Sequence, residues 1–217
     1  MTTTETVRRR LSAPARRERI EAAAVEVFAA RGYDAASVAE VAGAAGVTRT
    51  VLYDHFRSKR ELYLHVLDTQ NAAMLAEVGA GITGAGAGRD RMRATVAAYL
   101  SFARQRPAAR RILVDPIPTG DAELDRAART YRTARTQAVA TMLGPDLARA
   151  GLPHGSTAAE VVVELLITGV DGVARWWQDH PATTLDEVTE VATRLLWSGL
   201  PHLGEVRTSR SRSVPSR

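Results

Sequence analysis

A short segment of the chain, residues 48–59, is rich in side chains that donate hydrogen bonds. It combines two hydroxyls, a guanidinium, a phenol, an imidazole and the single lysine of the sequence: Thr48, Arg49, Thr50, Tyr53, His55 and Lys59. All of these groups can donate to phosphate oxygens or to the edges of nucleic-acid bases, whereas the carboxylate of Asp54 only accepts. The chemistry that this segment predicts is the binding of a polyanion.

The remaining sequence lacks the motifs that usually support catalysis. Because it contains no cysteine, thiolate nucleophiles, disulfides and cysteine-ligated zinc are excluded. It has no Gly-x-Ser-x-Gly turn, no His-Glu-x-x-His pair and no glycine-rich phosphate loop ending in Lys-Ser or Lys-Thr. The histidines are scattered in sequence, at positions 55, 65, 154, 180 and 202. We therefore expect neither an enzyme nor a bound metal or cofactor.

Positive charge gathers at both ends of a chain whose net charge is +5. Residues 1–19 hold six arginines against two glutamates, and residues 205–217 hold four arginines against one glutamate. We expect a disordered basic arm over residues 1–14 and a disordered basic tail over residues 205–217, either solvated or lying along a polyphosphate. The run Arg8-Arg9-Arg10 lacks the apolar stretch of an export signal, and no window of about 18 apolar residues exists. These features predict a cytoplasmic protein that has no contact with membranes.

Apolar residues recur every three to four positions through nearly the whole chain, which predicts an all-α fold of about nine helices. The first helix is expected at about 15–31, with Gly32 as its left-handed C-terminal cap. Pairs of a hydroxyl residue and a glutamate three positions later are typical of helix starts. Such pairs begin at Ser37, Ser58, Thr157 and Thr184.

Glycine and proline predict where the later helices end. Five glycines between Gly79 and Gly88 indicate a loop. Helices are expected at about 89–105, over a short stretch that ends before Pro116, and at about 121–143, where Gly144-Pro145 would close the helix. The last two helices are expected at 157 to about 180 and at 184 to about 197. The helix from residue 157 is apolar nearly all round, which favours burial on several sides and a subunit interface.

Two short helices joined at Gly46 would position the donor-rich segment. Val38, Val41, Ala42 and Ala45 form a packing face on the first, and Leu52 and Phe56 anchor the second. This pattern is typical of a helix-turn-helix, in which the second helix enters the major groove of DNA. We expect the helix-turn-helix domain to span residues 15–62 and a second domain to span residues 63–204.

The stretch from Ser37 to Leu62, SVAEVAGAAGVTRTVLYDHFRSKREL, resembles the signature of the TetR family of bacterial transcription regulators. The resemblance covers about residues 15–68, and its most specific part is Leu52-Tyr53-x-His55-Phe56-x-x-Lys59-x-x-Leu62. It implies that Thr48, Tyr53, His55 and Lys59 contact phosphates, and that Ser37 does so through the amides of its helix N-terminus. It also implies that Arg49, Thr50 and Asp54 face base edges.

The same resemblance implies a C-terminal helical domain that binds a ligand and forms a homodimer on a palindromic DNA operator. The family dimerises through its last two long helices, which here predicts an interface containing Leu165, Gly169, Gly172, Trp176 and Leu196. Repression is the usual activity in this family. The alternative to this interpretation is an all-helical protein-interaction scaffold that binds no DNA.

Family members are usually controlled by a small molecule in the C-terminal domain. We expect a hydrophobic pocket lined by Met74, Tyr99, Phe102, Leu113, Tyr131, Met142, Leu166 and Val170, all of which are equally compatible with ordinary core positions. Because the chain has only three Phe and three Trp, an aliphatic effector is favoured over a large aromatic one. The segments RRILVDP and ARWWQDHP resemble regulators that sense fatty acids or acyl-CoA. The side chains of Arg104, Arg106, Arg110 and Arg111 could then meet a phosphate.

Overall fold

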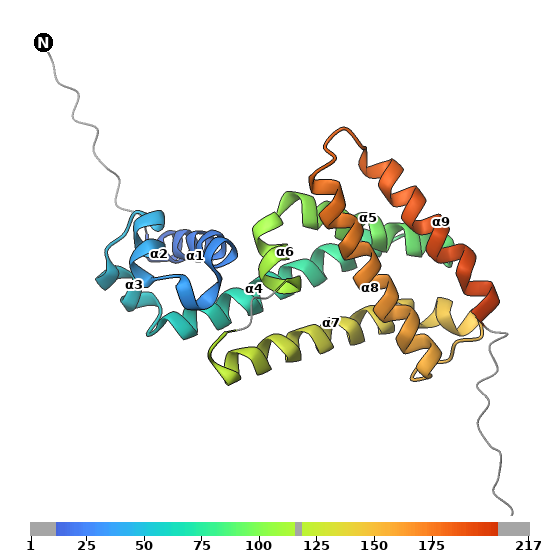
Figure 1. The fold of residues 1–217 in the computed structure, drawn as a ribbon, viewed down its shortest axis with the longest axis horizontal. Helices are drawn as coiled ribbons and strands as arrows, with labels where there is room; N and C mark the ends of the chain where they lie inside the picture. The colour runs from blue at the N-terminus through green and yellow to red at the C-terminus, as the bar shows by residue number, and fades with distance from the viewer. Residues whose placement is uncertain (1–11, 116–118, 204–217) are drawn as a thin grey trace, which may run out of the picture. The chain divides into compact units, whose positions relative to one another are not determined.

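The computed structural model describes residues 12–115 and 119–203, with side chains described as far as Ser198. These ranges contain nine α-helices and no strand, as the sequence predicts. The chain forms two compact units (Figure 1), one of residues 1–73 and 106–132 and the other of residues 74–105 and 133–217. The first unit therefore includes residues 63–73 and 106–132 in addition to the expected domain 15–62. Helices α4 (Lys59–Ile82) and α7 (Ala122–Arg149) contribute residues to both units.

The first unit contains α1 (Ala13–Ala35), α2 (Val38–Ala45), α3 (Arg49–His55), α6 (Pro107–Val114) and the starts of α4 and α7. The hydroxyl of Ser12 caps α1 by accepting from the Ala15 amide at 3.3 Å, and Pro14 follows in the first turn. Residues 12–14 of the expected basic arm thus begin α1, and residues 1–11 lie outside the described residues, as does the tail 205–217. Gly32 has the expected positive φ of 71°, and after this kink the helix continues to Ala35.

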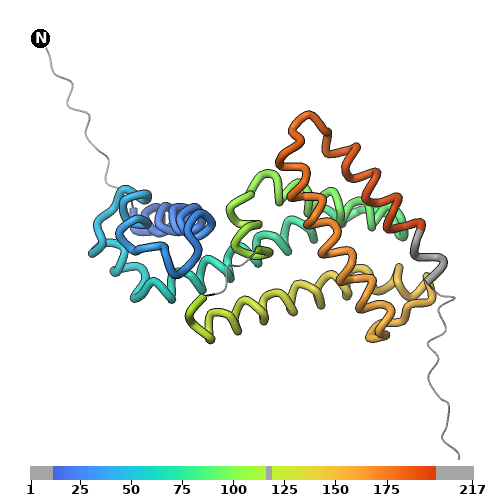
Figure 2. Tube along the Cα trace, in the orientation of Figure 1, coloured from blue at the N-terminus to red at the C-terminus, as the bar shows by residue number. Residues whose placement is uncertain are grey.

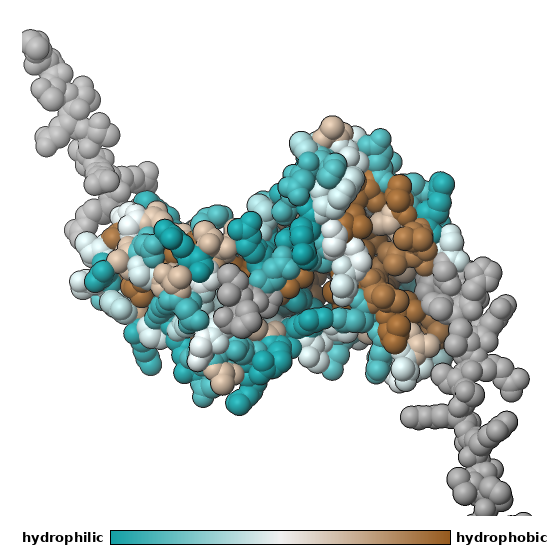
Figure 3. Space-filling model, in the orientation of Figure 1, coloured by the Kyte–Doolittle hydropathy of each residue, from teal (hydrophilic) through white to brown (hydrophobic). Residues whose placement is uncertain are grey.

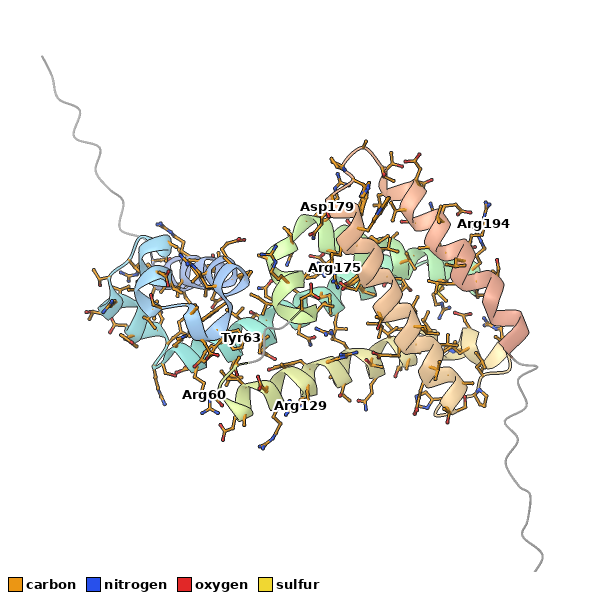
Figure 4. All side chains as sticks on the ribbon, viewed as in Figure 1. Arg60, Tyr63, Arg129, Arg175, Asp179 and Arg194 are labelled. Carbon is orange, nitrogen blue, oxygen red and sulfur yellow. The ribbon has the colours of Figure 1, made fainter. Side chains whose placement is uncertain are left out.

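An aromatic cluster lies between α1 and α4 in this unit. The rings of Phe28 and Tyr33 each lie 5.0 Å from the ring of Tyr63. Burial raises the pKa of the Tyr63 phenol above its ordinary value. The start of α7 is held to the start of α4 by ion pairs of Arg60 with Asp121 and Glu123 (Figure 4).

The second unit is built from α5 (Arg89–Gln105), α8 (Thr157–Gln178), α9 (Leu185–Leu203) and the ends of α4 and α7. Figure 2 shows the chain reversing over residues 179–184, so that α9 returns beside α8. Helix α5 packs against both, and the shared core includes Leu100, Val163, Leu166 and Trp177. The indole of Trp177 donates to the carbonyl of Thr183 at 2.8 Å, which fixes the reversal.

Besides α1, helices α4, α7 and α9 extend beyond their predicted ends, with α9 running to Leu203 rather than to about residue 197, and α8 begins at a different cap. Helix α4 runs into the glycine-rich segment as far as Ile82, where a Cβ on Gly81 would come within 2.6 Å of the Ala98 side chain, so glycine permits the close approach of α5. Helix α7 continues through Gly144-Pro145 to Arg149, because Leu143 and Leu147 on one face are both buried in the core. The cap of α8 is Ser156 rather than Thr157, since the Ser156 hydroxyl accepts from the Ala159 amide at 3.2 Å.

Candidate nucleic-acid interface

The start of α2 is fixed by a complete capping box. The Ser37 amide donates to the Glu40 carboxylate at 2.8 Å, and the Glu40 amide donates to the Ser37 hydroxyl at 3.1 Å. Hydrogen bonding to Ser37 lowers the pKa of the Glu40 carboxyl. The box leaves Ser37 exposed at the N-terminus of α2, where the partial positive charge of the helix favours an anion.

The turn between α2 and α3 depends on Gly46. Its φ of 65° is in the left-handed region, and its amide donates to the carbonyl of Gly43 at 3.0 Å. A Cβ at this position would lie 2.8 Å from a guanidinium nitrogen of Arg19, so an α1 side chain covers the turn. The backbone conformation therefore favours glycine here, whereas the flexible and exposed Arg19 side chain could move aside.

Helix α3 is buried on one face and presents polar groups on the other. Thr48 caps it by accepting from the Val51 amide at 3.2 Å. The anchor Leu52 is 0% exposed, whereas Tyr53 is 48% exposed and shares its face with Arg49. The phenol and guanidinium are thus directed away from the core, on a helix whose start is fixed by its own cap.

Two of the predicted DNA contacts, His55 and Lys59, are partly covered by the protein. The Lys59 ammonium donates to the carbonyl of Asp34 at 3.1 Å and lies 4.4 Å from the ring centroid of Tyr33. This carbonyl accepts only one of the three donors of an ammonium group. Lys59 is therefore oriented by the last turn of α1 and retains donors for a second partner.

All seven predicted DNA-binding residues belong to one unit and to one continuous stretch from the start of α2 to the start of α4. Ser37, Thr48, Arg49, Thr50 and Tyr53 are exposed, and His55 and Lys59 are half-buried. Phe56 is buried, as the sequence predicts. Two arginines of α1 that were not predicted also contact this segment: Arg17 reaches the end of α3, and Arg19 lies beside Gly46 in the turn between α2 and α3. Nothing in the helical pattern of α1 reveals what packs on it.

The second unit carries an exposed apolar face on α8 and α9. We define the α8–α9 face by its large exposed side chains, which are Val161, Leu165, Trp176, Val191 and Leu195. Figure 3 shows hydrophobic surface gathered over these two helices. The predicted interface residues Leu165, Gly169, Gly172 and Trp176 are all exposed on α8. Leu196 instead packs partly against the core, while its neighbour Leu195 is 76% exposed.

The eight predicted pocket residues are divided between the two units. Six of them belong to the second unit, whereas Leu113 and Tyr131 belong to the first. Leu166 and Val170 lie in the core cluster of the second unit, and Tyr99 packs at its edge with its hydroxyl donating to the buried carboxylate of Asp171 at 2.6 Å. Met74, Phe102 and Leu113 are also buried, and Met142 and Tyr131 are half-buried.

The cavities within the described residues include two that none of the eight predicted residues lines. One, of about 440 Å³, is formed by the end of α5 and the α8–α9 connection, with Arg104 stacked 4.2 Å from the ring centroid of Trp177. The other is small and lies between α1, α4 and α6.

The four arginines that could meet a phosphate are divided between the two units. Arg104 belongs to the second unit and Arg106, Arg110 and Arg111 to the first. Arg110 is buried and pairs with Asp115 at 3.0 Å, while Arg111 donates to the Ala29 carbonyl at 3.5 Å. Arg104, Arg110 and Arg111 thus each have a partner within the protein.

The part of the chain that the structure describes contains no cluster of three or more potential metal ligands. None of the helices in residues 12–115 and 119–203 combines the length and apolar character required to cross a membrane.

Comparison with known proteins supports the two-part organisation. The model of bacterial regulatory proteins of the tetR family matches residues 20–66, and the model of a tetracycline-repressor-like C-terminal domain matches residues 89–199. The chain is 31% identical over 199 residues to the HTH-type transcriptional activator FasR of Mycolicibacterium smegmatis, covering 92% of this chain and 89% of that protein.

Solved structures share the fold at low sequence identity. The fatty acid degradation regulator FadR of Bacillus halodurans aligns with a TM-score of 0.73 and 17% identity, over 88% of this chain and 98% of the other. FadR of Bacillus subtilis, solved with stearoyl-CoA, aligns with a TM-score of 0.70 and 16% identity, over 84% of this chain and 98% of the other.

Proposed function

Because the chain belongs to the TetR family of bacterial transcription regulators, we propose that it binds a palindromic operator as a homodimer and that a small hydrophobic effector controls this binding. The observation that carries the proposal is the exposed face of α3, where Arg49 and Tyr53 project from a helix anchored by buried Leu52. The protein would act in the cytoplasm, where its DNA target lies.

The proposed contacts divide into two kinds. Thr48, Tyr53, His55 and Lys59 hold phosphates, with help from the N-terminus of α2 at Ser37, and they set the register of the protein on the duplex. Arg49 and Thr50 read base edges. An arginine that donates two hydrogen bonds to guanine contributes about 1 to 3 kcal/mol of discrimination between bases.

Fluorescence anisotropy with labelled DNA from upstream of the protein's own gene tests this function. We expect saturable binding whose affinity falls steeply with salt, because phosphate contacts release counterions. Arg49→Ala should relax the preference at one base position while binding to unrelated DNA stays the same. A scaffold that binds no DNA would give no anisotropy change even at low salt, and an unchanged base preference in Arg49→Ala would reject the assigned role of Arg49.

Dimerisation is proposed through the α8–α9 face. Val161, Leu165 and Trp176 project from α8 and Leu195 from α9, and a contiguous apolar surface of this kind is typical of a protein interface. Gly169 and Gly172 leave room for a close helix crossing, since no atom lies within 4 Å of a Cβ placed on either. Two-fold symmetry would separate the two α3 helices by about 34 to 36 Å, one turn of the duplex.

The proposed effector is a fatty acid or an acyl-CoA thioester. The support is the likeness to FasR and to FadR, one of which was solved with stearoyl-CoA, together with the apolar interior of the second unit. Titrating the DNA complex with acyl-CoA thioesters of increasing chain length should shift operator affinity at one range of lengths. Equal affinity with every chain length and with free coenzyme A would reject an acyl effector.

The direction of regulation depends on where the operator lies. A dimer bound over the promoter blocks RNA polymerase, as the family resemblance predicts, whereas FasR is named as an activator. We propose repression, and a reporter gene driven by the bound promoter tests it. Higher expression without the regulator supports repression, and lower expression rejects it.

A further inference from the structure

The C-terminal end of α3 is held by a side chain from α1. The last carbonyls of a helix have no partner within it. At α3, the carbonyl of His55 accepts from a guanidinium nitrogen of Arg17 at 3.3 Å. The same guanidinium lies 4.4 Å from the ring centroid of Phe56, the residue that ends the helix. Arg17 thus contacts both the last carbonyl of α3 and its buried anchor.

Arg17 is in turn fixed by a chain of polar contacts. Its Nε lies 2.9 Å from the Glu21 carboxylate, one turn further along α1. The same carboxylate oxygen lies 2.8 Å from Nε2 of His65 on α4. The centroid of the His65 ring lies 5.2 Å from that of the Phe56 ring, so both ends of this chain of contacts reach Phe56.

We propose that Arg17 is a positioning residue for DNA reading: the Arg17–Glu21–His65 chain fixes the direction in which α3 presents its polar face. A helix as short as α3 (Arg49–His55) has little stability of its own, so its direction depends on its anchors. Thr48 fixes its start and Arg17 fixes its end. Because Glu21 already balances the charge of Arg17, the guanidinium acts through α3 rather than by binding phosphate.

Arg19 provides a matched control on the same helix. It is exposed, lies beside Gly46 in the turn between α2 and α3, and has no ion pair among residues 12–115 and 119–203. Replacing either arginine by glutamine removes one positive charge from α1. Only the change at Arg17 removes the contact with the end of α3.

The inference rests on the proposed operator binding, and the first test measures that binding over a range of salt concentrations. Arg17→Gln should weaken operator affinity about tenfold or more, because a charged hydrogen bond and its stacking are lost. The slope of log affinity against log salt should stay the same, since no phosphate contact is removed. Glu21→Gln should weaken binding in the same direction, and adding it to Arg17→Gln should cause little further loss.

Hydrogen exchange supplies a readout that does not depend on DNA. In Arg17→Gln the amide of Phe56, which donates to Leu52 at 2.9 Å, should exchange faster than in Arg19→Gln, and by more than any change in the free energy of unfolding measured in urea accounts for. A salt slope reduced by about one unit, with exchange unchanged, would show a phosphate contact and overturn the proposal. Unchanged affinity in Arg17→Gln would also overturn it. If the wild type binds no operator, operator binding itself is rejected, and faster exchange at Phe56 still supports the anchoring of α3.

Discussion

The helix-turn-helix segment and the α8–α9 face both present side chains outward, but their directions are set in different ways. In the helix-turn-helix, a capping box at Ser37, a left-handed glycine at Gly46 and a cap at Thr48 determine where each helix begins. On α8 and α9, the outward direction of Leu165 and Leu195 follows from which neighbouring residues the core buries. Local backbone chemistry fixes the first surface, and long-range packing fixes the second.

The largest effect is expected from a charge placed on the α8–α9 face. Leu195→Glu would put an unpaired carboxylate into the proposed interface twice, once from each subunit, and should weaken dimerisation on the order of a hundredfold. Sedimentation velocity should show monomer, with operator affinity lost in parallel. Ala148→Glu on the exposed side of α7 is the control. A dimer that survives Leu195→Glu would mean that this face is not the interface.

A change on the polar face of α3 should affect binding and leave folding intact. Tyr53→Ala should weaken binding to all operator sequences about equally, by roughly 5- to 20-fold, because a phosphate contact carries no base information. Competition between DNA sequences in the same assay measures this. Tyr53→Phe separates the hydroxyl from the ring, since only the former donates to phosphate. A sequence-dependent loss would indicate that Tyr53 reads a base.

The turn between the two short helices should respond through stability. Gly46→Ala places a Cβ at a φ of 65° and beside Arg19, so it should lower the free energy of unfolding by about 1 to 2 kcal/mol. Urea denaturation followed by circular dichroism measures the change. Gly43→Ala is the control, because no atom lies within 4 Å of its Cβ and a helical glycine gains from alanine. Equal midpoints for the two variants would contradict the role given to Gly46.

The smallest effect is the pH dependence of the α2 cap. The pKa of Glu40 is lowered in the folded protein, so the box stabilises the fold near neutral pH and this contribution disappears as the pH falls through the lowered pKa. In Glu40→Gln the free energy of unfolding should therefore fall less steeply as the pH is lowered. Its slope on the alkaline side should stay the same. Denaturation midpoints measured at several pH values test this. If the midpoints of wild type and variant fall equally as the pH is lowered, Glu40 does not contribute to the pH dependence of stability.

The same contrast explains how much of the structure the sequence predicts. The boxes at Ser37 and Thr184 and the positive φ of Gly32 and Gly46 are confirmed, because each depends on neighbours within a few positions. Burial of Phe56 is also confirmed. Gly32 does not end the first helix as predicted, since α1 continues past it to Ala35. The closure of α7 at Gly144-Pro145 was wrong, since burial of residues further along the helix outweighs the local break.

Residues that lie on long helices are harder to assign. Leu196 was predicted for the interface, but it is its neighbour Leu195 that is exposed. Telling the two apart requires knowing which side of α9 meets α5 and α8. The expected pocket was chosen by hydrophobicity alone, and two of its members, Leu113 and Tyr131, belong to a different unit from the rest. The roles proposed for the interface and pocket residues stay predictions.

The sequence contains a single ε-amine, that of Lys59, which can therefore be labelled selectively. Lys59 stands on the ring of Tyr33 at the proposed DNA surface, and every other basic side chain except histidine is an arginine. An amine-directed acylating reagent would therefore modify the body of the protein at one place only. The rate at which Lys59 reacts would measure how accessible the proposed DNA surface is. The rate should fall when a duplex covers Lys59 and recover when an effector releases the duplex.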